Sequence, residues 1–236
     1  MITHTDFSEY AALIFDCDGV IFDSNAAKTT AFRDTALRFG YSEASASEFA
    51  EWQSQNFGTS RYAVVEALIG GRFGPPVGVE PDRAQLLSHY ARLVRMMYSE
   101  VPTTAGLTSF LDSTRDILAF VASGSDQEEL RDVLNERNIA SRFAGIFGSP
   151  TSKKEIVIHL VEGLRSTDPA ARILMIGDAH TDLDAAMAND IDFLFLAGYS
   201  SVRRSMLERV QALGLPHLER FSDIEASVGV GGEASD

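Results

Sequence analysis

The sequence is poor in cysteine and in positive charge. It has one cysteine, one tryptophan and 20 basic residues against 34 acidic ones, which gives a net charge of −14. A single cysteine cannot form an internal disulfide, so we expect a reducing compartment, the cytoplasm. The excess of acidic residues repels nucleic-acid phosphates and anionic membrane surfaces, which argues against both as partners.

Long apolar runs and targeting signals are also missing. No stretch of about 18 or more apolar residues occurs, so the sequence contains no candidate transmembrane helix. Residues 1–6 lack the basic start and the apolar segment of a secretory signal peptide. With 236 residues and 45% hydrophobic content, the chain is able to form one large domain or two small ones.

Five short apolar runs predict buried parallel strands, because the runs are continuous rather than alternating. They cover residues 11–15, 117–122, 145–147, 173–176 and 193–197. Amphipathic helical patterns separate the later runs, and this alternation is typical of a doubly wound α/β fold. We therefore predict a Rossmann-like, mostly parallel sheet.

The connection between the first two predicted strands is too long for a single crossover. It covers roughly residues 20–116 and carries helical patterns of its own at residues 26–39, 47–57, 60–69 and 82–98. We therefore predict an α/β core formed by residues 1–22 and 101–236, with an α-helical cap domain inserted at residues 23–100.

Polar side chains with catalytic potential follow four of the predicted strands. Each is common when taken alone, but the carboxyl ends of parallel strands meet at one edge of a sheet, where ligands bind in open α/β folds. Their shared position therefore indicates one site. In chain order the residues are Asp16, Asp18, Ser123, Gly124, Lys153, Asp178 and Asp182.

These residue types suit phosphoryl transfer. A carboxylate is able to attack phosphorus and form an aspartyl-phosphate, while a second carboxylate moves a proton. Carboxylates that lie close together repel one another unless a cation lies among them, and Mg²⁺ prefers oxygen ligands. Lys153 offers a positive charge and Ser123 a hydroxyl to a phosphate. Ser125 and Glu128 form a Ser-x-x-Glu pattern, which predicts a helix capped by Ser125 whose N-terminus would favour phosphate.

The motifs together resemble those of the haloacid dehalogenase superfamily, in its phosphatase and phosphomutase branch, over essentially the whole chain. The resemblance implies a Mg²⁺-dependent phosphatase for a small phosphorylated metabolite, such as a sugar phosphate or a phosphoglycolate-like compound. It implies that Asp16 is the nucleophile and Asp18 the general acid and base. The implied metal ligands are Asp16, Asp18 through its backbone carbonyl, and Asp178, supported by Asp182, and the implied phosphate ligands are Ser123, Gly124 and Lys153.

The third motif departs from the family pattern. Many capped relatives have Lys-Pro-x-Pro there, whereas no proline follows Lys153 in this sequence. Lys154 is therefore an alternative, although the spacing from residues 148–150 favours Lys153. The presence of Asp18 argues for phosphate chemistry, because dehalogenases of the superfamily lack the second aspartate. Cys17 has no arginine shortly after it, as a cysteine-dependent phosphatase requires, and we expect it to pack as a spacer.

Within the predicted cap, Arg61 is the first candidate for a substrate contact, because it begins a helix after a glycine turn. An arginine on the protein surface is the alternative interpretation. Asn25 and Lys28, near the start of the cap, are further candidates.

Two other functions stay open at this stage. A sugar phosphomutase of the same architecture would also use Asp16 and would return the phosphoryl group to another hydroxyl, and no motif separates it from a phosphatase. A phosphoaccepting switch of the receiver type also uses an acidic cluster, a Ser or Thr and a Lys at strand ends, but it connects its first two strands with one helix. The sequence does not determine the oligomeric state.

Overall fold

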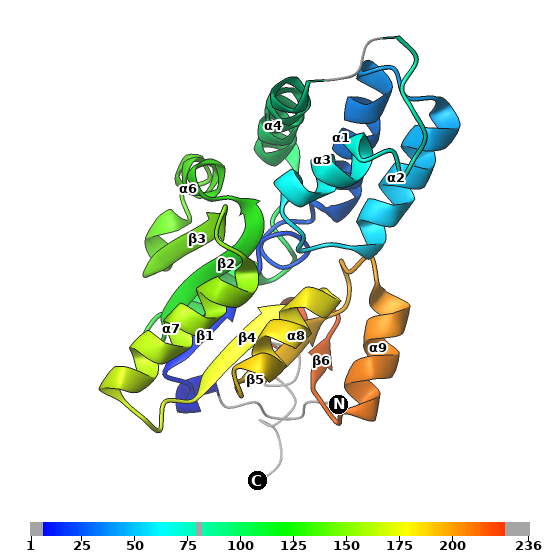
Figure 1. Cartoon of the computed structure of the whole chain (residues 1–236). Helices are drawn as coiled ribbons and strands as arrows, with labels where there is room; N and C mark the ends of the chain where they lie inside the picture. The colour runs from blue at the N-terminus through cyan, green and yellow to red at the C-terminus, as the bar shows by residue number, and fades with distance from the viewer. Residues whose placement is uncertain (1–6, 79–81, 225–236) are drawn as a thin grey trace, which may run out of the picture.

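The parallel sheet is the centre of the structure, a computed structural model that describes residues 7–78 and 82–224. Its strands run in the order β3-β2-β1-β4-β5-β6 (Figure 1), all paired in parallel. The five predicted strands are present, which confirms the predicted Rossmann-like fold; the ends of the predicted core at residues 1–6 and 225–236 lie outside the described residues. The strands are β1 (Ala12–Phe15), β2 (Leu118–Asp126), β3 (Gly145–Ser149), β4 (Ile173–Gly177), β5 (Asp192–Leu196) and β6 (His217–Leu218).

Helices connect these strands and form a separate group between β1 and β2. None of the described helices combines the length and the apolar character needed to cross a bilayer. They are α1 (Asn25–Arg38), α2 (Glu43–Gln55), α3 (Arg61–Ile69), α4 (Arg83–Glu100), α5 (Leu107–Ser113), α6 (Gln127–Glu136), α7 (Lys153–Thr167), α8 (His180–Ala188) and α9 (Arg203–Ala212), with short 3-10 turns at Phe7–Glu9 and Ala140–Arg142.

Each face of the sheet has its own apolar core. All four residues of β1 are buried, and successive side chains point to opposite faces. Leu13 and Phe15 join the core shared with α5, α6 and the helices that precede them, whereas Ala12 and Ile14 join the core shared with α7, α8 and α9. Burial on both faces explains why the strands are continuous apolar runs.

Helices α1–α4 occupy the chain between β1 and β2, where the sequence predicts an insertion. They lie together at one end of the sheet (Figure 1), with α1 packed against α2 and α4 and with α3 packed against α4. The rings of Phe32 and Tyr90 stack with centroids 3.9 Å apart, which joins α1 to α4 through buried aromatic side chains. We call residues 23–100 the helical insertion; their division from the core as a separate domain stays a prediction.

Capping side chains determine where the helices of the insertion begin. Ser42, Ser60 and Asp82 accept hydrogen bonds from backbone amides of the first turns of α2, α3 and α4. Helix α2 therefore begins at residue 43, earlier than the apolar pattern alone predicts, because a cap acts before the first buried residue.

The junction between β2 and α6 differs from the prediction. Strand β2 continues to Asp126, whose carboxylate accepts from the amide of Glu129 and caps α6. The prediction that Ser125 caps this helix is wrong, because the Ser125 hydroxyl donates to Asp18. Helices α5 and α9 and strand β6 were not predicted; β6 has only two residues and leaves no periodic pattern.

Candidate active site

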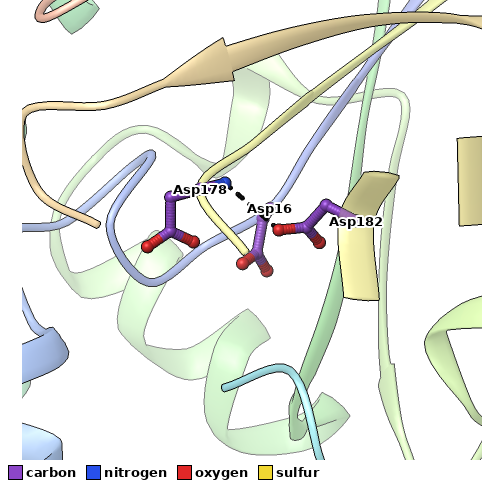
Figure 2. Close-up of side chains that lie close together, drawn as sticks. All are labelled: Asp16, Asp178 and Asp182. Atoms are coloured by element: carbon purple, nitrogen blue, oxygen red, sulfur yellow. Dashed lines mark hydrogen bonds between the residues drawn. The ribbon is translucent and has the colours of Figure 1, made fainter. Parts of the chain in front are cut away.

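Four buried charged side chains meet at the carboxyl ends of β1 and β4. Asp16 follows β1, Asp178 follows β4, Asp182 lies in the first turn of α8 and Lys153 begins α7. One carboxylate oxygen from each of the three aspartates lies within 4.8 Å of the others, and Figure 2 shows the three side chains converging. We call Asp16, Lys153, Asp178 and Asp182 the sheet-edge cluster.

Asp182 is held in place by three donors. Its carboxylate accepts from the backbone amides of Asp178 at 3.1 Å and Ala179 at 3.0 Å, and from Lys153 Nζ at 2.5 Å. Figure 2 shows the first of these bonds as a dashed line. Asp182 thus orients the turn that carries Asp178, which agrees with the supporting position predicted for it.

Lys153, rather than Lys154, lies at the cluster. Its Nζ is 2.8 Å from Asp16 Oδ1, whereas Lys154 is exposed. Ser152 and Glu155 form a reciprocal capping box at the start of α7, which fixes the first turn of that helix. The cap therefore determines that the first lysine of the pair points into the site.

The cluster contains more negative than positive charge. Three carboxylates and one ammonium group leave two uncompensated negative charges in a buried region. Burial raises the pKa of Asp16 to about 7. The positive charge of Lys153 opposes this rise, and the negative charges of Asp182 and Asp18 add to it. Burial and the charges of Asp16 and Asp182 raise the pKa of Asp178 well above its usual range. A divalent cation among these oxygens would remove the repulsion, so the donor set fits a metal ion.

Asn25 lies against Asp178 and is not among the residues that line the adjoining cavity. Its Nδ2 donates to Asp178 Oδ2 at 2.6 Å and to the backbone carbonyl of Tyr199 at 3.0 Å. Both partners are acceptors, which determines the orientation of the amide. Gly19 permits this contact, because a Cβ there would lie 2.3 Å from Asp178 Oδ2 at a φ of +78°. The substrate contact predicted for Asn25 stays a prediction; in this structure its amide is bonded to Asp178 and Tyr199.

Asp18 lies only two residues from Asp16, but its carboxylate faces the helical insertion. Oδ1 accepts from Ser24 Oγ at 2.6 Å and from Tyr98 OH at 2.7 Å. Oδ2 accepts from Lys28 Nζ at 2.6 Å and from Ser125 Oγ at 3.2 Å. We call these five residues the Asp18 cage.

The hydrogen-bond donors of the cage outweigh the effect of burial on the pKa of Asp18. Burial alone would raise the pKa of this carboxyl, but the charge and hydrogen bond of Lys28, with the hydroxyl donors, bring the pKa below its usual value.

Cys17, between the two aspartates, is fully buried in the apolar core, as predicted for a spacer. Burial raises the pKa of its thiol, so the thiol stays protonated and is a poor nucleophile.

Ser123 and Gly124 lie beside Asp16 at the end of β2. Ser123 Oγ accepts from the amide of Ser125 at 3.1 Å, which leaves its hydrogen free to donate to a ligand. A Cβ on Gly124 would lie 2.5 Å from the carbonyl oxygen of Gly58. Glycine at this position therefore lets the loop between α2 and α3 lie directly over the end of β2.

A small cavity separates these residues from the helical insertion. Its volume is about 20 Å³, and residues that follow β1, residues of β2 and residues of the insertion contribute to its wall. Its lining consists of Asp16, Asp18, Ser123, Gly124 and Ser125 together with Lys28, Phe32, Gln53, Phe57, Gly58, Thr59, Arg61 and Tyr90.

Arg61 lines this cavity and is 6% exposed, so it is not an arginine of the protein surface. Its Nη1 donates to Glu129 Oε2 at 3.0 Å, and its Nη2 donates to Glu129 Oε1. Tyr62, the next residue, donates to Asp126 at 3.1 Å. The start of α3 is thereby joined to the start of α6, across the boundary between insertion and sheet.

Several residues of the site were not predicted. They are Ser24, Tyr98 and Ser125 on Asp18, Tyr90 at the cavity, and Glu129 on Arg61. Tyr90 and Tyr98 are eight residues apart on one buried face of α4, a spacing that also describes ordinary core packing. The sequence offered no signal that separates a tyrosine of the site from a tyrosine packed in the core.

Comparison with known proteins was made at the level of family, sequence and structure. The family model described as haloacid dehalogenase-like hydrolase matches residues 13–196. The tyrosine-protein kinase PtkA of Mycobacterium tuberculosis is 24% identical over 92% of this chain and 72% of its own length. A β-phosphoglucomutase from Clostridium difficile superposes with a TM-score of 0.68 at 20% identity, covering 92% of this chain and 96% of the other. YfnB from Bacillus subtilis, solved with bound magnesium, gives 0.60 at 19% identity, covering 88% and 100%.

Proposed function

Because the chain belongs to the haloacid dehalogenase-like hydrolase family, we propose that it is a Mg²⁺-dependent phosphatase. It would hydrolyse a small phosphomonoester through an aspartyl-phosphate on Asp16. The observation that carries this proposal is that two neighbouring carboxylates at one cavity have different cationic partners. Asp16 lies beside Lys153 at 2.8 Å and Asp18 beside Lys28 at 2.6 Å, and both aspartates line the cavity where a leaving group would lie.

The buried cluster supports a resident divalent cation. Asp178 accepts a hydrogen bond from the Asn25 side chain through Oδ2, and its other carboxylate oxygen is available to a ligand. The carboxylate of Asp182 already accepts hydrogen bonds from three donors. The carboxylates of Asp16 and Asp178 and the backbone carbonyl of Asp18 would hold Mg²⁺. The bound ion would neutralise negative charge on the transferring phosphoryl group.

In the first half of the proposed reaction, an oxygen of Asp16 attacks phosphorus and the bond from phosphorus to the ester oxygen breaks. Asp18 gives its proton to the departing oxygen, which leaves as an alcohol. Lys153 and the Ser123 hydroxyl would bind phosphoryl oxygens, and both are buried next to Asp16. Their fixed charge and dipole would stabilise the transition state.

In the second half, ionised Asp18 takes a proton from water, and the water oxygen attacks phosphorus. The bond to Asp16 breaks, inorganic phosphate leaves, and Asp18 holds the proton needed for the next cycle. Lys28 brings the pKa of Asp18 below its usual value, which favours the ionised form that this step requires. The first half requires the protonated form, so Lys28 would have to lie farther from Asp18 in that step than the 2.6 Å of this structure.

The helical insertion would act as a cap. The cavity is small, about 20 Å³, so we expect the insertion to move away from the sheet when a phosphomonoester enters. Closure over the bound substrate would then exclude bulk water.

Phosphate release from a panel of small phosphomonoesters, measured with Mg²⁺ and with EDTA, tests the proposal. We expect Mg²⁺-dependent release from the wild-type protein and none from Asp16→Asn. Mass spectrometry of acid-quenched protein should detect phosphate on the peptide that contains Asp16. Turnover by Asp16→Asn at the wild-type rate would show that another residue is the nucleophile.

Phosphoryl transfer to an acceptor other than water is the second candidate. The similarity to a β-phosphoglucomutase and to PtkA motivates it, although both similarities are below 25% identity. Stoichiometric inorganic phosphate indicates a phosphatase, whereas an isomerised sugar phosphate or a phosphorylated tyrosine peptide indicates a transferase. A receiver-type switch is disfavoured, because receiver domains have the strand order 2-1-3-4-5 and this sheet has the order β3-β2-β1-β4-β5-β6.

The net charge of −14 argues against a nucleic acid or an anionic membrane as a partner, and it does not forbid a small phosphorylated metabolite as the substrate. The positive charges that would bind it are local and buried, on Lys153, Lys28 and Arg61.

A further inference from the structure

Arg61, a cation that the insertion places at the cavity, already has an anionic partner outside the insertion. Its Nη1 donates to Glu129 Oε2 at 3.0 Å, and its Nη2 donates to Glu129 Oε1. The two side chains are only 7% and 12% exposed. Burial alone would lower the pKa of Arg61, but the hydrogen bonds and the charge of Glu129 raise it above its usual value. The guanidinium group therefore stays charged, and a carboxylate bound through both oxygens balances that charge.

The position of Glu129 is determined by α6 rather than by the insertion. Glu129 lies in the first turn of this helix, where its backbone amide donates to the Asp126 carboxylate at 3.1 Å. The helix dipole favours an ionised carboxylate at this end of a helix. Asp126 also accepts from Tyr62, the neighbour of Arg61, at 3.1 Å. Glu129 is thus a counter-charge held in a fixed place beside Arg61.

The other cation that the insertion contributes to the cavity is paired in the same way. Of the described residues that line the cavity, the cations are Lys28 and Arg61. Lys28 Nζ lies 2.6 Å from Asp18 Oδ2, and the two side chains are 10% and 8% exposed. Each cation at the cavity therefore has its own carboxylate before a substrate binds.

The charges around the site leave no surplus positive charge for a second anionic group of a substrate. The cations are Lys28, Arg61 and Lys153. They are outnumbered by the three carboxylates of the sheet-edge cluster together with those of Asp18 and Glu129. A bound Mg²⁺ would balance this difference, and the phosphoryl group alone would then make the sum negative. A further negative charge would meet this excess in a buried region, where charges interact strongly.

On the basis of the proposed phosphatase function, we infer that Glu129 determines which leaving groups the site accepts. By neutralising Arg61, Glu129 makes a leaving group with a negative charge of its own unfavourable, whether that charge is a carboxylate or a second phosphate. An uncharged alcohol meets no such repulsion. Glu129 acts through Arg61, because Glu129 is not among the residues that line the cavity. Specificity of this kind depends on a repulsive element as well as on attractive contacts.

Two esters with the same number of carbons test this inference. The kcat/KM is measured for 3-phosphoglycerate and for glycerol 3-phosphate, which has a hydroxymethyl group in place of the carboxylate. We expect the wild-type protein to prefer glycerol 3-phosphate roughly tenfold or more. Glu129→Gln removes the negative charge and keeps a carbonyl oxygen for Arg61. It should raise the ratio of kcat/KM for 3-phosphoglycerate over glycerol 3-phosphate roughly tenfold, through a gain for 3-phosphoglycerate.

The matched control changes another glutamate of the same helix. Glu136 also pairs with an arginine of the insertion, Arg95, but these side chains are 56% and 60% exposed, so solvent and salt screen the charge. Glu136→Gln should leave the ratio of the two kcat/KM values unchanged. If Glu129→Gln instead lowers kcat/KM for both esters by the same factor, Glu129 only holds the insertion in place and the inference is overturned.

A double variant keeps the test available if Glu129→Gln alone does not fold with Arg61 buried and unpaired. Arg61→Gln combined with Glu129→Gln removes one charge of each sign, so the wild-type ratio should be retained within about twofold. A ratio that falls roughly tenfold in the double variant would show that Arg61 binds the carboxylate of 3-phosphoglycerate directly, which overturns the role of Glu129.

A binding measurement separates this inference from the proposed function. Calorimetry with Asp16→Asn and excess Mg²⁺, with and without Glu129→Gln, gives the Kd of each ester in the absence of turnover. Weaker binding of 3-phosphoglycerate that Glu129→Gln reverses supports the inference even if the wild-type protein hydrolyses no phosphomonoester, a result that refutes only the phosphatase. Tighter binding of 3-phosphoglycerate by the protein with Glu129 intact, or a ratio of Kd values that Glu129→Gln does not change, overturns the inference.

Discussion

Asp16 and Asp18 are two residues apart, yet they belong to regions with opposite electrostatics. The sheet-edge cluster around Asp16 holds three carboxylates and one lysine, and it raises the pKa of Asp16 to about 7. The Asp18 cage holds one carboxylate with a lysine and three hydroxyl donors, and the pKa of Asp18 lies below its usual value. The sheet-edge cluster has fewer positive than negative groups, whereas both carboxylate oxygens of Asp18 in the cage accept hydrogen bonds.

This difference indicates how two adjacent carboxylates take different roles. A group whose neighbours repel its charge accepts a cation or an electrophilic phosphorus atom, whereas a group held by a lysine is kept ionised and oriented. Titratable groups whose environments separate their pKa values mark the division of labour in acid and base chemistry. The helical insertion supplies Ser24, Lys28 and Tyr98 of the cage, so under the proposed mechanism it would contribute to the chemistry as well as to the enclosure.

The largest expected effect comes from the centre of the sheet-edge cluster. Asp16→Asn removes the proposed nucleophile, and we expect kcat for phosphate release to fall by roughly 10³-fold or more. Circular dichroism and thermal unfolding should show an intact fold. The matched control is Asp132→Asn, which changes an aspartate that is 61% exposed and should leave kcat unaltered. Equal losses in the two variants would contradict a special role for Asp16.

The Asp18 cage is tested by removal of its cation. Lys28→Met leaves Asp18 buried and unpaired, so we expect the free energy of unfolding to fall by about 3–5 kcal/mol, measured by urea denaturation. Lys154→Met, at an exposed lysine, should change stability by less than about 0.5 kcal/mol. The double variant Lys28→Met with Asp18→Asn should recover most of the loss. A single variant as stable as the wild type would mean that the ion pair does not hold Asp18.

Removal of the hydrogen bond from Asn25 of the insertion to Asp178, the proposed metal ligand, is expected to have an intermediate effect on the affinity for Mg²⁺. Asn25→Ala removes the donor at 2.6 Å from Asp178, and we expect the Kd for Mg²⁺ to rise roughly 10-fold or more, as measured by calorimetry. Asn135→Ala, at an exposed asparagine of α6, serves as the control. An unchanged Kd in Asn25→Ala would separate the insertion from the metal site.

The smallest expected effect is the pH dependence of the stabilisation that Mg²⁺ gives to the fold. The folded protein raises the pKa of Asp16 from 3.8 to about 7, so it binds protons more tightly than the unfolded chain. This contribution therefore favours the metal-free fold at low pH and is lost as pH rises from about 4 to about 7. Because Mg²⁺ replaces the protons, we expect it to raise Tm by several degrees more at about pH 8 than at about pH 5. Thermal unfolding with EDTA and with Mg²⁺ measures this difference, and Asp178→Asn should abolish most of it. A Mg²⁺ effect independent of pH would contradict the repulsion in the cluster.

Local chemistry explains which features could be predicted. Residues 11–15 are continuously apolar because β1 is buried on both faces, and that pattern is visible in one dimension. The start of α7, with Lys153 buried and Lys154 exposed, shows the opposite case. Which lysine of the pair at 153 and 154 enters the site depends on where α7 begins, and the capping box determines this. Ser125 has a similar helix-capping pattern, but its hydroxyl is taken by Asp18, 107 residues away, and Asp126 caps α6 instead.

The sequence by itself determined the succession of the first five strands along the chain, the long helical insertion and the polar residues that gather at the carboxyl ends of the strands, because burial, turns and capping act over a few neighbouring residues. Only the tertiary structure decided the surroundings of each carboxylate. Lys28 reaches Asp18 across ten residues, Asn25 reaches Asp178 across 153, and Arg61 reaches Glu129 across 68. Such contacts follow from how the helical insertion lies against the rest of the chain, and electrostatic interactions depend on distance in space rather than distance along the chain.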